Sequence, residues 1–261
     1  ALLPPALDDD FMIEASVSAG TSPVLTLTPL GPDGLFNNNL ITAVVNNEEA
    51  VSHLLTELLE TLSQKGFQGV DIDFEYILPT DRIAFADFVF LTRQTLSSYG
   101  YFVSVALAPK TSDDQAGLLY AGKDYGLLGQ AADSVLLMTY EWGYTYGPPM
   151  AVAPINKVRE VVDYAAARIP PSKIDLGIPN YGYDWTLPYE RGSRARTLGN
   201  LEAVELAVSE GVPISFDETA MSPYFFYEKD GLTHEVWFED VRSYREKFSL
   251  LPLYGLRGLG I

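Results

Sequence analysis

The sequence predicts an α/β fold built on a parallel sheet and, within that class, a (β/α)8 (TIM) barrel. Short apolar, β-branched runs alternate with segments of helical periodicity, which is the order expected of a parallel sheet. The second to fifth runs begin roughly 30 to 40 residues apart, the length of one βα unit. No Gly-x-Gly-x-x-Gly follows any of them, which argues against a nucleotide-binding doubly wound sheet.

The runs predicted as strands cover residues 23–30, 69–76, 101–108, 134–139, 173–179 and 256–261. Before the second strand, Asn46 and Glu49 form a capping-box pattern, and Lys65 with Gly66 supplies a helix stop. Apolar residues between them recur at helical spacing from Val51 onward. Residues 81–99 and 154–169 carry similar helical patterns, so the predicted order is strand, helix, strand, helix.

The alternation of predicted strands and helices changes between Tyr183 and Leu250. A helix is expected near residues 201–209, and two β-rich runs, 224–227 and 233–238, flank a Lys-Asp-Gly turn typical of a hairpin. A last helix is expected at 239–248. We interpret residues 186–238 as a small hairpin-containing insertion before the last barrel helix, within one domain that spans residues 1–261.

An eight-stranded barrel needs more strands than this chain shows. The final run stops at Ile261 almost as soon as it begins, and residues 1–10 resemble the polar tail of an earlier element. A barrel left open between its first and last strands would expose sheet edges and apolar surface. We therefore expect the natural polypeptide to be longer, because this chain lacks the first strands and the end of the last strand.

Composition narrows the functional classes. The 261 residues include 35 acidic and 17 basic side chains, a formal charge of -18 that would repel phosphate backbones and anionic membranes. We expect neither a nucleic-acid nor a membrane partner. The absence of cysteine excludes disulfides and thiolate metal sites, and two histidines are too few for a three-histidine zinc site. No metal or other cofactor is expected.

The most informative segment is 69–76, Gly-Val-Asp-Ile-Asp-Phe-Glu-Tyr. Asp71, Asp73 and Glu75 occupy alternate positions of a β-forming run, so they share one strand face about 6.6 Å apart per step. Crowding like charges costs stability, which suggests acid–base chemistry at the strand end where barrel active sites lie. The alternative is a solvated edge strand whose carboxylates face water.

Three segments, in the correct order, resemble glycoside hydrolase family 18, the chitinase-like family. The acidic segment matches three of the four acids of that family's Asp-x-x-Asp-x-Asp-x-Glu motif, with Gln68 at the first position. Residues 138–141, Met-Thr-Tyr-Glu, resemble its Met-x-Tyr-Asp, and residues 177–182 resemble its Gly-x-Pro-x-Tyr-Gly. From about Pro23 onward, the chain is most similar to the branch of bacterial spore cortex-lytic N-acetylglucosaminidases, or spore peptidoglycan hydrolases.

The resemblance implies a retaining glycosidase whose nucleophile is the substrate's own 2-acetamido group. A protein nucleophile needs two carboxyl groups on opposite sides of the scissile bond, which acids on one strand face cannot easily supply. By resemblance, Glu75 is the general acid and then the general base. Asp73 orients the acetamido N–H and stabilises the developing positive charge, and Asp71 shares a proton or hydrogen bond with Asp73.

The resemblance also gives Tyr140 a role, donation of its hydroxyl to the acetamido oxygen. Further candidates for substrate binding are aromatic residues that could stack on the apolar faces of sugar rings, together with two polar residues: Trp142, Tyr181, Tyr183, Trp185, Trp237, Glu141 and Asn180. Each aromatic residue could equally be a packing residue of the core. Relatives normally carry a tryptophan at the end of the last strand, and this chain has none there.

The favoured function is hydrolysis of β-1,4 bonds that follow N-acetylglucosamine, with peptidoglycan preferred over chitin. We expect a monomeric bacterial enzyme, extracellular and associated with the cell wall or spore. The alternatives are a chitinase, a non-catalytic carbohydrate-binding protein on the same fold, an enzyme with Glu141 as a conventional nucleophile, and a metal-dependent glycosyltransferase using Asp71 and Asp73. Glu75 favours an enzyme, and the lack of glycine loops and basic residues for a nucleotide diphosphate weakens the last alternative.

Overall fold

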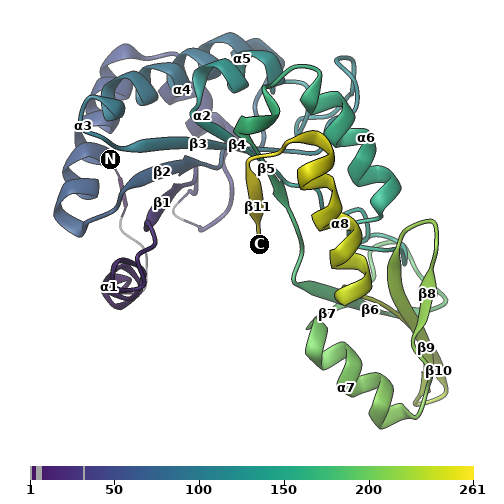
Figure 1. Ribbon diagram of the computed structural model, residues 1–261. Coiled ribbons are helices and arrows are strands. Elements are labelled where there is room, and N and C mark those ends of the chain that lie inside the picture. Colours follow the sequence, from purple (N-terminus) through teal and green to yellow (C-terminus); the bar gives the residue numbers. More distant parts are fainter. Residues whose placement is uncertain (1, 4–7, 32) are drawn as a thin grey trace. The chain divides into compact units, whose positions relative to one another are not determined.

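The computed structural model describes residues 2–3, 8–31 and 33–261, which form two compact units. The first unit comprises Ala1–Leu137 and Ala167–Ile174, and the second comprises Met138–Ala166 and Asp175–Ile261. Figure 1 shows the elements of both. In the described part of the chain, every helix is too short or too polar to cross a membrane.

The first unit is a parallel sheet with helices between its strands. Strands β1 (Val24–Leu27), β2 (Gly69–Ile72), β3 (Phe102–Leu107) and β4 (Ser134–Leu137) pair in chain order. The connecting helices are α2 (Asn38–Val45), α3 (Glu48–Lys65), α4 (Arg82–Ser97) and α5 (Tyr125–Ala131), with short 3-10 turns at Pro79–Asp81 and Pro171–Lys173. Parallel strands separated by helices confirm the predicted α/β class.

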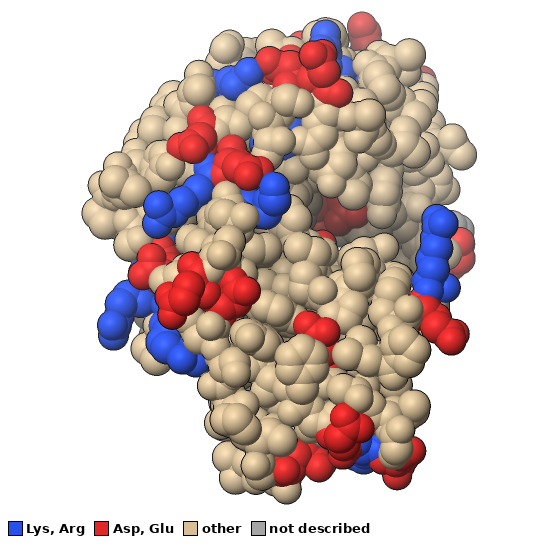
Figure 2. Space-filling model, turned by 90° about the vertical axis from the view of Figure 1, so that its right-hand side faces the viewer, with Lys and Arg blue, Asp and Glu red and all other residues tan. Residues whose placement is uncertain are grey.

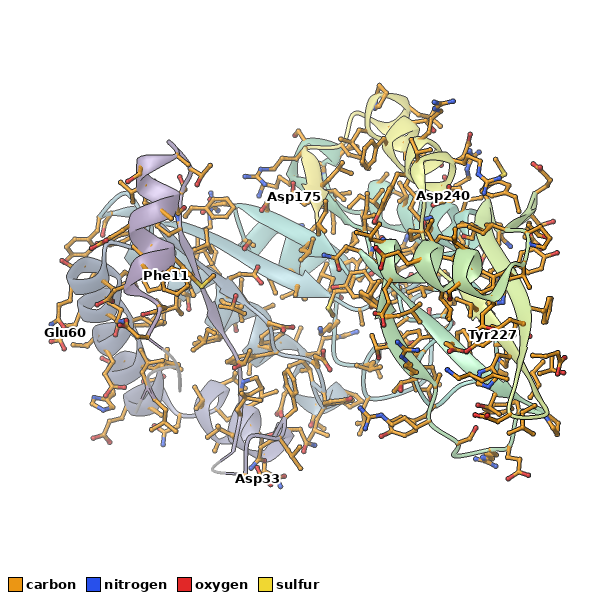
Figure 3. All side chains as sticks on the ribbon, turned by 90° about the horizontal axis from the view of Figure 1, so that it is seen from below. Phe11, Asp33, Glu60, Asp175, Tyr227 and Asp240 are labelled. Carbon is orange, nitrogen blue, oxygen red and sulfur yellow. The ribbon has the colours of Figure 1, made fainter. Side chains whose placement is uncertain are left out.

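The core of the first unit lies between the sheet and α3, α4 and α5. In Figure 1, α4 and α5 lie together along one side of β3. Helix α1 (Asp10–Ser18) lies on the other side of the strands, nearest the viewer in Figure 3, where its Phe11 is 70% exposed. The buried strand residues are β-branched or aliphatic, including Val70, Ile72, Val103 and Val105, which are all fully buried. This pattern is typical of strands covered on both faces.

Helix α3 forms where the sequence predicts a helix, with its N-cap shifted by one residue. The Asn47 side chain, not that of Asn46, accepts the capping hydrogen bond, from the Ala50 N–H at 3.0 Å. Asn46 instead donates to Asp81 Oδ1 at 2.9 Å, a tertiary contact with no local sequence signal. At the other end, Gly66 ends the helix with a φ of 85°, as the stop signal predicts.

The second unit combines a parallel pair of strands with an antiparallel sheet. Strand β5 (Ile174–Gly177) pairs with β11 (Gly258–Gly260), and α6 (Ile155–Ala166) lies beside α8 (Val241–Tyr254). The antiparallel sheet has the order β7-β6-β10-β9-β8, formed by Arg196–Gly199, Tyr181–Leu187, Leu232–Trp237, Ser222–Lys229 and Ser215–Asp217. The predicted hairpin is therefore part of a larger sheet that already begins at Tyr181.

The antiparallel sheet has its own apolar core, closed by α7 (Asn200–Glu210). Phe225, Val236 and Phe238 are buried against Ala203 and Ala207 of the helix. The next helix, α8, begins at the N-cap Asp240, labelled in Figure 3, whose carboxylate accepts from the Arg242 N–H at 2.8 Å. The N-cap of α8 and the apolar core beneath the antiparallel sheet therefore hold the backbone in place on both sides of Trp237.

The surface reflects the acidic composition. On the face shown in Figure 2, clusters of Asp and Glu alternate with scattered Lys and Arg and with uncharged surface. Many of the basic side chains are paired with acids, for example Arg242 with Asp240 and Arg196 with Glu202. Exposed pairs of this kind contribute little to stability.

Replacing Gly66 by Ala should lower the free energy of unfolding by about 1 kcal/mol, because a Cβ disfavours the left-handed backbone that ends α3. Urea denaturation measures the change. Gly66→Asn is the matched control and should cost less, because Asn tolerates the left-handed region. Equal losses in both variants would contradict the conformational explanation.

Candidate active site

The three carboxylates lie at the C-terminal end of β2. The strand ends at Ile72, four residues before the end of the predicted 69–76 run, where its pairing with both β1 and β3 stops. Asp73 still donates its backbone N–H to Leu27 O at 3.0 Å, so the extended path continues just beyond the strand. Burial alternates along this path: Val70, Ile72 and Phe74 are buried, while the three acids are partly exposed. The three carboxylates therefore lie on one side of the extended segment, as the alternation in the sequence predicts.

Packing on the opposite face fixes the segment that carries the acids. The Phe74 ring stacks against Phe85 and Phe88 of α4, with ring centroids 5.8 and 5.7 Å apart. All three rings are at most 4% exposed. Such buried aromatic contacts are worth about 0.5–1.5 kcal/mol beyond area burial, so they hold Asp73 and Glu75 in place from behind.

Hydrogen bonding differs between the acids. Ser104 on β3 donates its hydroxyl to Asp71 Oδ1. The Oδ1 atom of Asp73 is buried and has no hydrogen-bond partner among the described residues. Gln68, which replaces the first acid of the family motif, accepts from the Ser22 hydroxyl at 2.7 Å. It lies outside the row formed by Asp71, Asp73 and Glu75, which we call the carboxylate ladder. A buried carboxylate oxygen without a partner is costly, which is typical of a functional group.

Burial is the main influence on the acidity of the ladder. It raises the pKa of Asp73, while the ammonium of Lys123 opposes the rise. It also raises the pKa of Glu75, with a further rise from the Asp73 charge and an opposing effect of Lys123. For Glu75, the effect of the Asp73 charge ranks second to desolvation. A glutamate with a raised pKa is suited to donate a proton.

Lys123 is the part of this site that sequence reasoning missed. It lies between β3 and α5, is 1% exposed and interacts electrostatically with all three acids. Its local sequence, Ala-Gly-Lys-Asp, does not distinguish it from a surface lysine. Only the folded position of its loop reveals it.

In the second unit, the predicted residues gather around Glu141. Its carboxylate Oε1 accepts hydrogen bonds from the hydroxyls of Tyr181 at 2.5 Å and Tyr183 at 2.9 Å. Its backbone has a φ of 66°, a left-handed conformation that non-glycine residues seldom adopt and that clusters at functional sites. Burial, and then the hydrogen bond to Glu141, raises the pKa of both tyrosines, so both remain protonated donors.

The aromatic candidates differ in accessibility. Tyr181, Tyr183 and Trp185 alternate along β6, and their neighbouring rings lie 5.7 and 5.6 Å apart. Trp185 is 1% exposed and donates Nε1–H to Gly147 O at 2.8 Å, so its ring faces are occupied by protein. Burial at this level places Trp185 in the core, not among sugar-stacking residues. Tyr183, at 6% exposed, has little free surface either.

The remaining candidates lie nearer the surface of the second unit. Tyr140, Tyr181 and Trp237 are partly buried against the Tyr183–Trp185 cluster. The Trp237 ring stacks on Tyr224 at 4.7 Å and donates Nε1–H to Glu235 at 2.7 Å. Trp142 is partly exposed and Asn180 is exposed. These residues retain surface that a ligand can contact.

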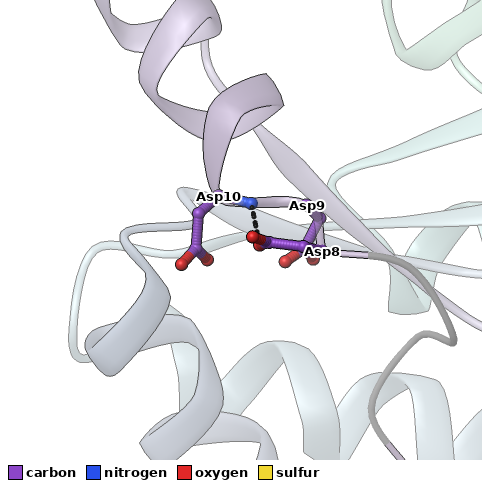
Figure 4. Close-up of side chains that lie close together, drawn as sticks. All are labelled: Asp8, Asp9 and Asp10. Carbon is purple, nitrogen blue, oxygen red and sulfur yellow. Dashed lines mark hydrogen bonds between the residues drawn. The ribbon is translucent and has the colours of Figure 1, made fainter.

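A separate acidic cluster, Asp8, Asp9 and Asp10, lies at the start of α1 (Figure 4). The Asp10 N–H donates to Asp8 Oδ1 at 3.1 Å, and Lys65 pairs with both Asp9 and Asp10. The hydrogen bond from Lys65 lowers the pKa of Asp9. The pairing with Lys65, next to the start of a helix, accounts for the cluster structurally.

A parallel α/β fold with a row of carboxylates at a strand end is typical of one class of protein, the glycosidases built on a (β/α)8 barrel. The chain belongs to glycosyl hydrolases family 18, whose sequence model matches residues 34–261. This confirms the family expected from the three motifs and the barrel class expected from the strand pattern.

Individual relatives agree with this assignment. The chain is 41% identical over 244 residues to the cortical fragment-lytic enzyme of Bacillus subtilis, covering 93% of this chain and 56% of that protein. The crystal structure of the Bacillus cereus spore cortex-lytic enzyme SleL is 37% identical with a TM-score of 0.95, covering 99% of this chain and 60% of that one. A chitinase from Chromobacterium violaceum is 27% identical with a TM-score of 0.91, covering 99% and 80%. The chain thus spans just over half the length of its first curated relatives.

Replacing Asp73 by Asn should stabilise the protein at pH 7. The raised pKa of Asp73 means that its ionised form is favoured less in the folded than in the unfolded state, so the wild type loses stability as the pH rises through the folded pKa. Thermal unfolding should give a higher Tm for the variant at pH 7, and the advantage should vanish toward pH 4. A lower Tm at pH 7 would contradict this account.

Replacing Tyr183 by Phe should lower the free energy of unfolding by about 1.5–3 kcal/mol, because a buried hydroxyl no longer donates to the Glu141 carboxylate. Denaturant titration of the wild type and variant measures the loss. In a Glu141→Ala background the same substitution should cost markedly less. Equal costs in both backgrounds would show that the hydrogen bond contributes nothing.

Proposed function

We propose that this protein is a peptidoglycan hydrolase that cleaves β-1,4 bonds following N-acetylglucosamine, with Glu75 as general acid and base. The observation that carries the proposal is the one-sided ladder at the end of β2, where burial raises the pKa of Glu75. A second carboxylate on the opposite side of the bond is not needed when the substrate supplies the nucleophile.

The proposed reaction has two steps. The carbonyl oxygen of the 2-acetamido group attacks the anomeric carbon, the glycosidic C–O bond breaks, and Glu75 gives its proton to the leaving oxygen. This forms an oxazolinium ion whose positive charge Asp73 stabilises. Water then attacks the same carbon, and the Glu75 carboxylate takes its proton, which restores the acid and the acetamido group. Asp71 holds Asp73 in orientation, and Tyr140 donates to the acetamido oxygen.

The unpartnered Asp73 oxygen supports this assignment of roles. Asp73 Oδ1 is buried without a hydrogen-bond partner among the described residues, so it is free to accept the N–H of an acetamido group. Substrate binding would then satisfy a group whose desolvation is otherwise uncompensated. The energetic cost seen without substrate becomes binding energy for the acetamido sugar.

Relatives support peptidoglycan over chitin. The relative at 41% identity is named a cortical fragment-lytic enzyme, whereas the chitinase structure is 27% identical. We therefore propose spore or cell-wall peptidoglycan as the substrate and a spore-associated location. Chitooligosaccharides are the second candidate, favoured by the TM-score of 0.91 to that chitinase. The monomeric state remains a prediction.

Glu75→Gln should lower kcat by about 10²–10⁴-fold on purified peptidoglycan fragments, because the amide cannot transfer the proton. Release of reducing ends measures the rate. Glu60→Gln makes the same chemical change on an exposed position of α3, labelled in Figure 3, and should leave the rate unchanged. Full activity in Glu75→Gln would contradict the proposed function.

Mass spectrometry of products identifies the substrate. Digests of defined peptidoglycan fragments should end in reducing N-acetylglucosamine, and chitooligosaccharides should be cleaved more slowly. Preferential cleavage of chitooligosaccharides would instead assign the chain to the second candidate. Binding of both ligands without turnover would favour a carbohydrate-binding protein.

A further inference from the structure

Lys123 is a lysine buried in the first unit. It follows Gly122 and precedes Asp124, the N-cap of α5, and its side chain is 1% exposed. Its Nζ donates to Ala106 O on β3 at 3.1 Å. Burying an ammonium group is expensive unless an opposite charge compensates, so a single carbonyl partner does not account for the position.

The backbone around Lys123 is held tightly against the segment that carries the acids. A Cβ on Gly122 would lie 2.2 Å from the carbonyl oxygen of Ile77, which is too close, so only glycine fits at this position. Ile77 follows Glu75 by two residues, and the loop that carries Lys123 is therefore packed against the segment that carries the acids. The Lys123 carbonyl accepts from Lys110 Nζ at 3.0 Å, and its N–H donates to Tyr120 O at 3.1 Å. The backbone of Lys123 therefore has a fixed position, from which its Nζ reaches Ala106 O.

Sheet register places that ammonium level with the ladder. Asp71 on β2 lies opposite Ser104 on β3, and Ile72 lies opposite Val105. The residues that follow these pairs are Asp73 after β2 and Ala106 on β3, so these two lie at the same level. Because Lys123 Nζ is bonded to Ala106 O, it lies at the level of Asp73. Its electrostatic partners are, in order of effect, Asp73, Glu75 and Asp71.

Other charges near Lys123 belong to different contacts. Lys110 donates to the carbonyls of Lys123 and Tyr120, and burial lowers its pKa. Asp124 accepts from the Leu127 N–H at 3.0 Å and lies 4.0 Å from Arg82. Asp81 accepts from Thr42 and Asn46. The three acids of the ladder are thus the anions with which the Lys123 ammonium is balanced.

We propose that Lys123 is a positioning residue of the active site whose ammonium balances the ladder, keeping Asp71 and Asp73 ionised while Glu75 retains the transferable proton. The role of Glu75 rests on the proposed function. Without the cation, a proton would be shared among three crowded acids, and Asp73 would lose the charge that stabilises the oxazolinium ion. Desolvation lowers the pKa of Lys123 to about 8, so the balance weakens in alkaline solution.

Replacing Lys123 by Met tests the inference through the pH dependence of catalysis. Methionine keeps the side-chain length and removes the charge, so the pKa values of Asp73 and Glu75 should rise. The acid limb of kcat/KM should move to higher pH by about 1 pH unit, the lower end of the effect of a nearby opposite charge. Lys123→Arg keeps the charge and should restore the wild-type profile.

Lys173→Met is the matched control. Lys173 also bonds backbone carbonyls, Gly129 O at 2.9 Å and Ala132 O at 2.8 Å, and it belongs to the same unit, but its electrostatic partners are Arg93 and Asp133. It should change stability and leave the pH profile in place. A Lys123→Met profile that coincides with the wild type overturns the proposal.

A second measurement needs neither activity nor a folded Lys123→Met variant. In protein labelled with ¹³C at lysine Cε, the Lys123 resonance, assigned by its loss in Lys123→Arg, should titrate near pH 8. In Glu75→Gln and Asp73→Asn it should titrate at lower pH, because an anion has been removed. Titration at the ordinary lysine value of about 10.4 in all three proteins would overturn the proposal.

The two readouts separate the two proposals. If Glu75→Gln remains active while the Lys123 titration responds to it, the proposed function fails and the charge pairing stands. If Glu75→Gln is inactive and the Lys123 titration ignores both acid variants, the proposed function stands and the role of Lys123 fails.

Discussion

Desolvation of the carboxylate ladder at the end of β2 is the constraint around which the first unit is organised. Three acids on one side of an extended segment repel one another, and burial raises the pKa of both Asp73 and Glu75. The segment holds this arrangement because Phe74 packs between the strands and α4 on the opposite side. The three carboxylates destabilise the fold locally, and packing of the apolar core compensates for this loss, as is common at functional sites.

The same constraint explains why Lys123 is buried. A cation tied to β3 beside the ladder offsets part of the repulsion without leaving the acids exposed to water. A stronger positive charge would lower the pKa of Glu75, which burial raises, and without any cation protonation of Asp73 would be favoured as well. One partly compensating charge allows acids on the same strand face to have different protonation states.

Sequence patterns predicted the regular parts of this structure well. The ladder, the strand order of the first unit and the helix stop at Gly66 follow from local periodicity and turn chemistry, which act over a few residues. The three motifs also gave the family, which the match over residues 34–261 confirms. The predicted run extends four residues beyond the end of β2, because pairing with both neighbouring strands stops at Ile72 while the β-forming composition continues.

What sequence could not supply depends on distant contacts. The cap at Asn47 in place of Asn46 reflects the bond between Asn46 and Asp81. The sequence makes Trp185 a candidate for stacking on sugar rings, and only the fold shows that it is buried and bonded to Gly147. Lys123 is similar, because its importance arises from Gly122 packing on Ile77 and from the β2–β3 register.

We infer that the ladder holds a proton on Glu75 beside ionised neighbours. The most direct measurement is a ¹³C NMR titration of the Asp and Glu carboxyl carbons in the wild-type protein, with the ladder resonances assigned by single substitutions. Glu75 should titrate above the ordinary glutamate value of about 4.3, and its curve should show a second inflection from a neighbouring acid. A single, unshifted inflection for Glu75 would contradict it.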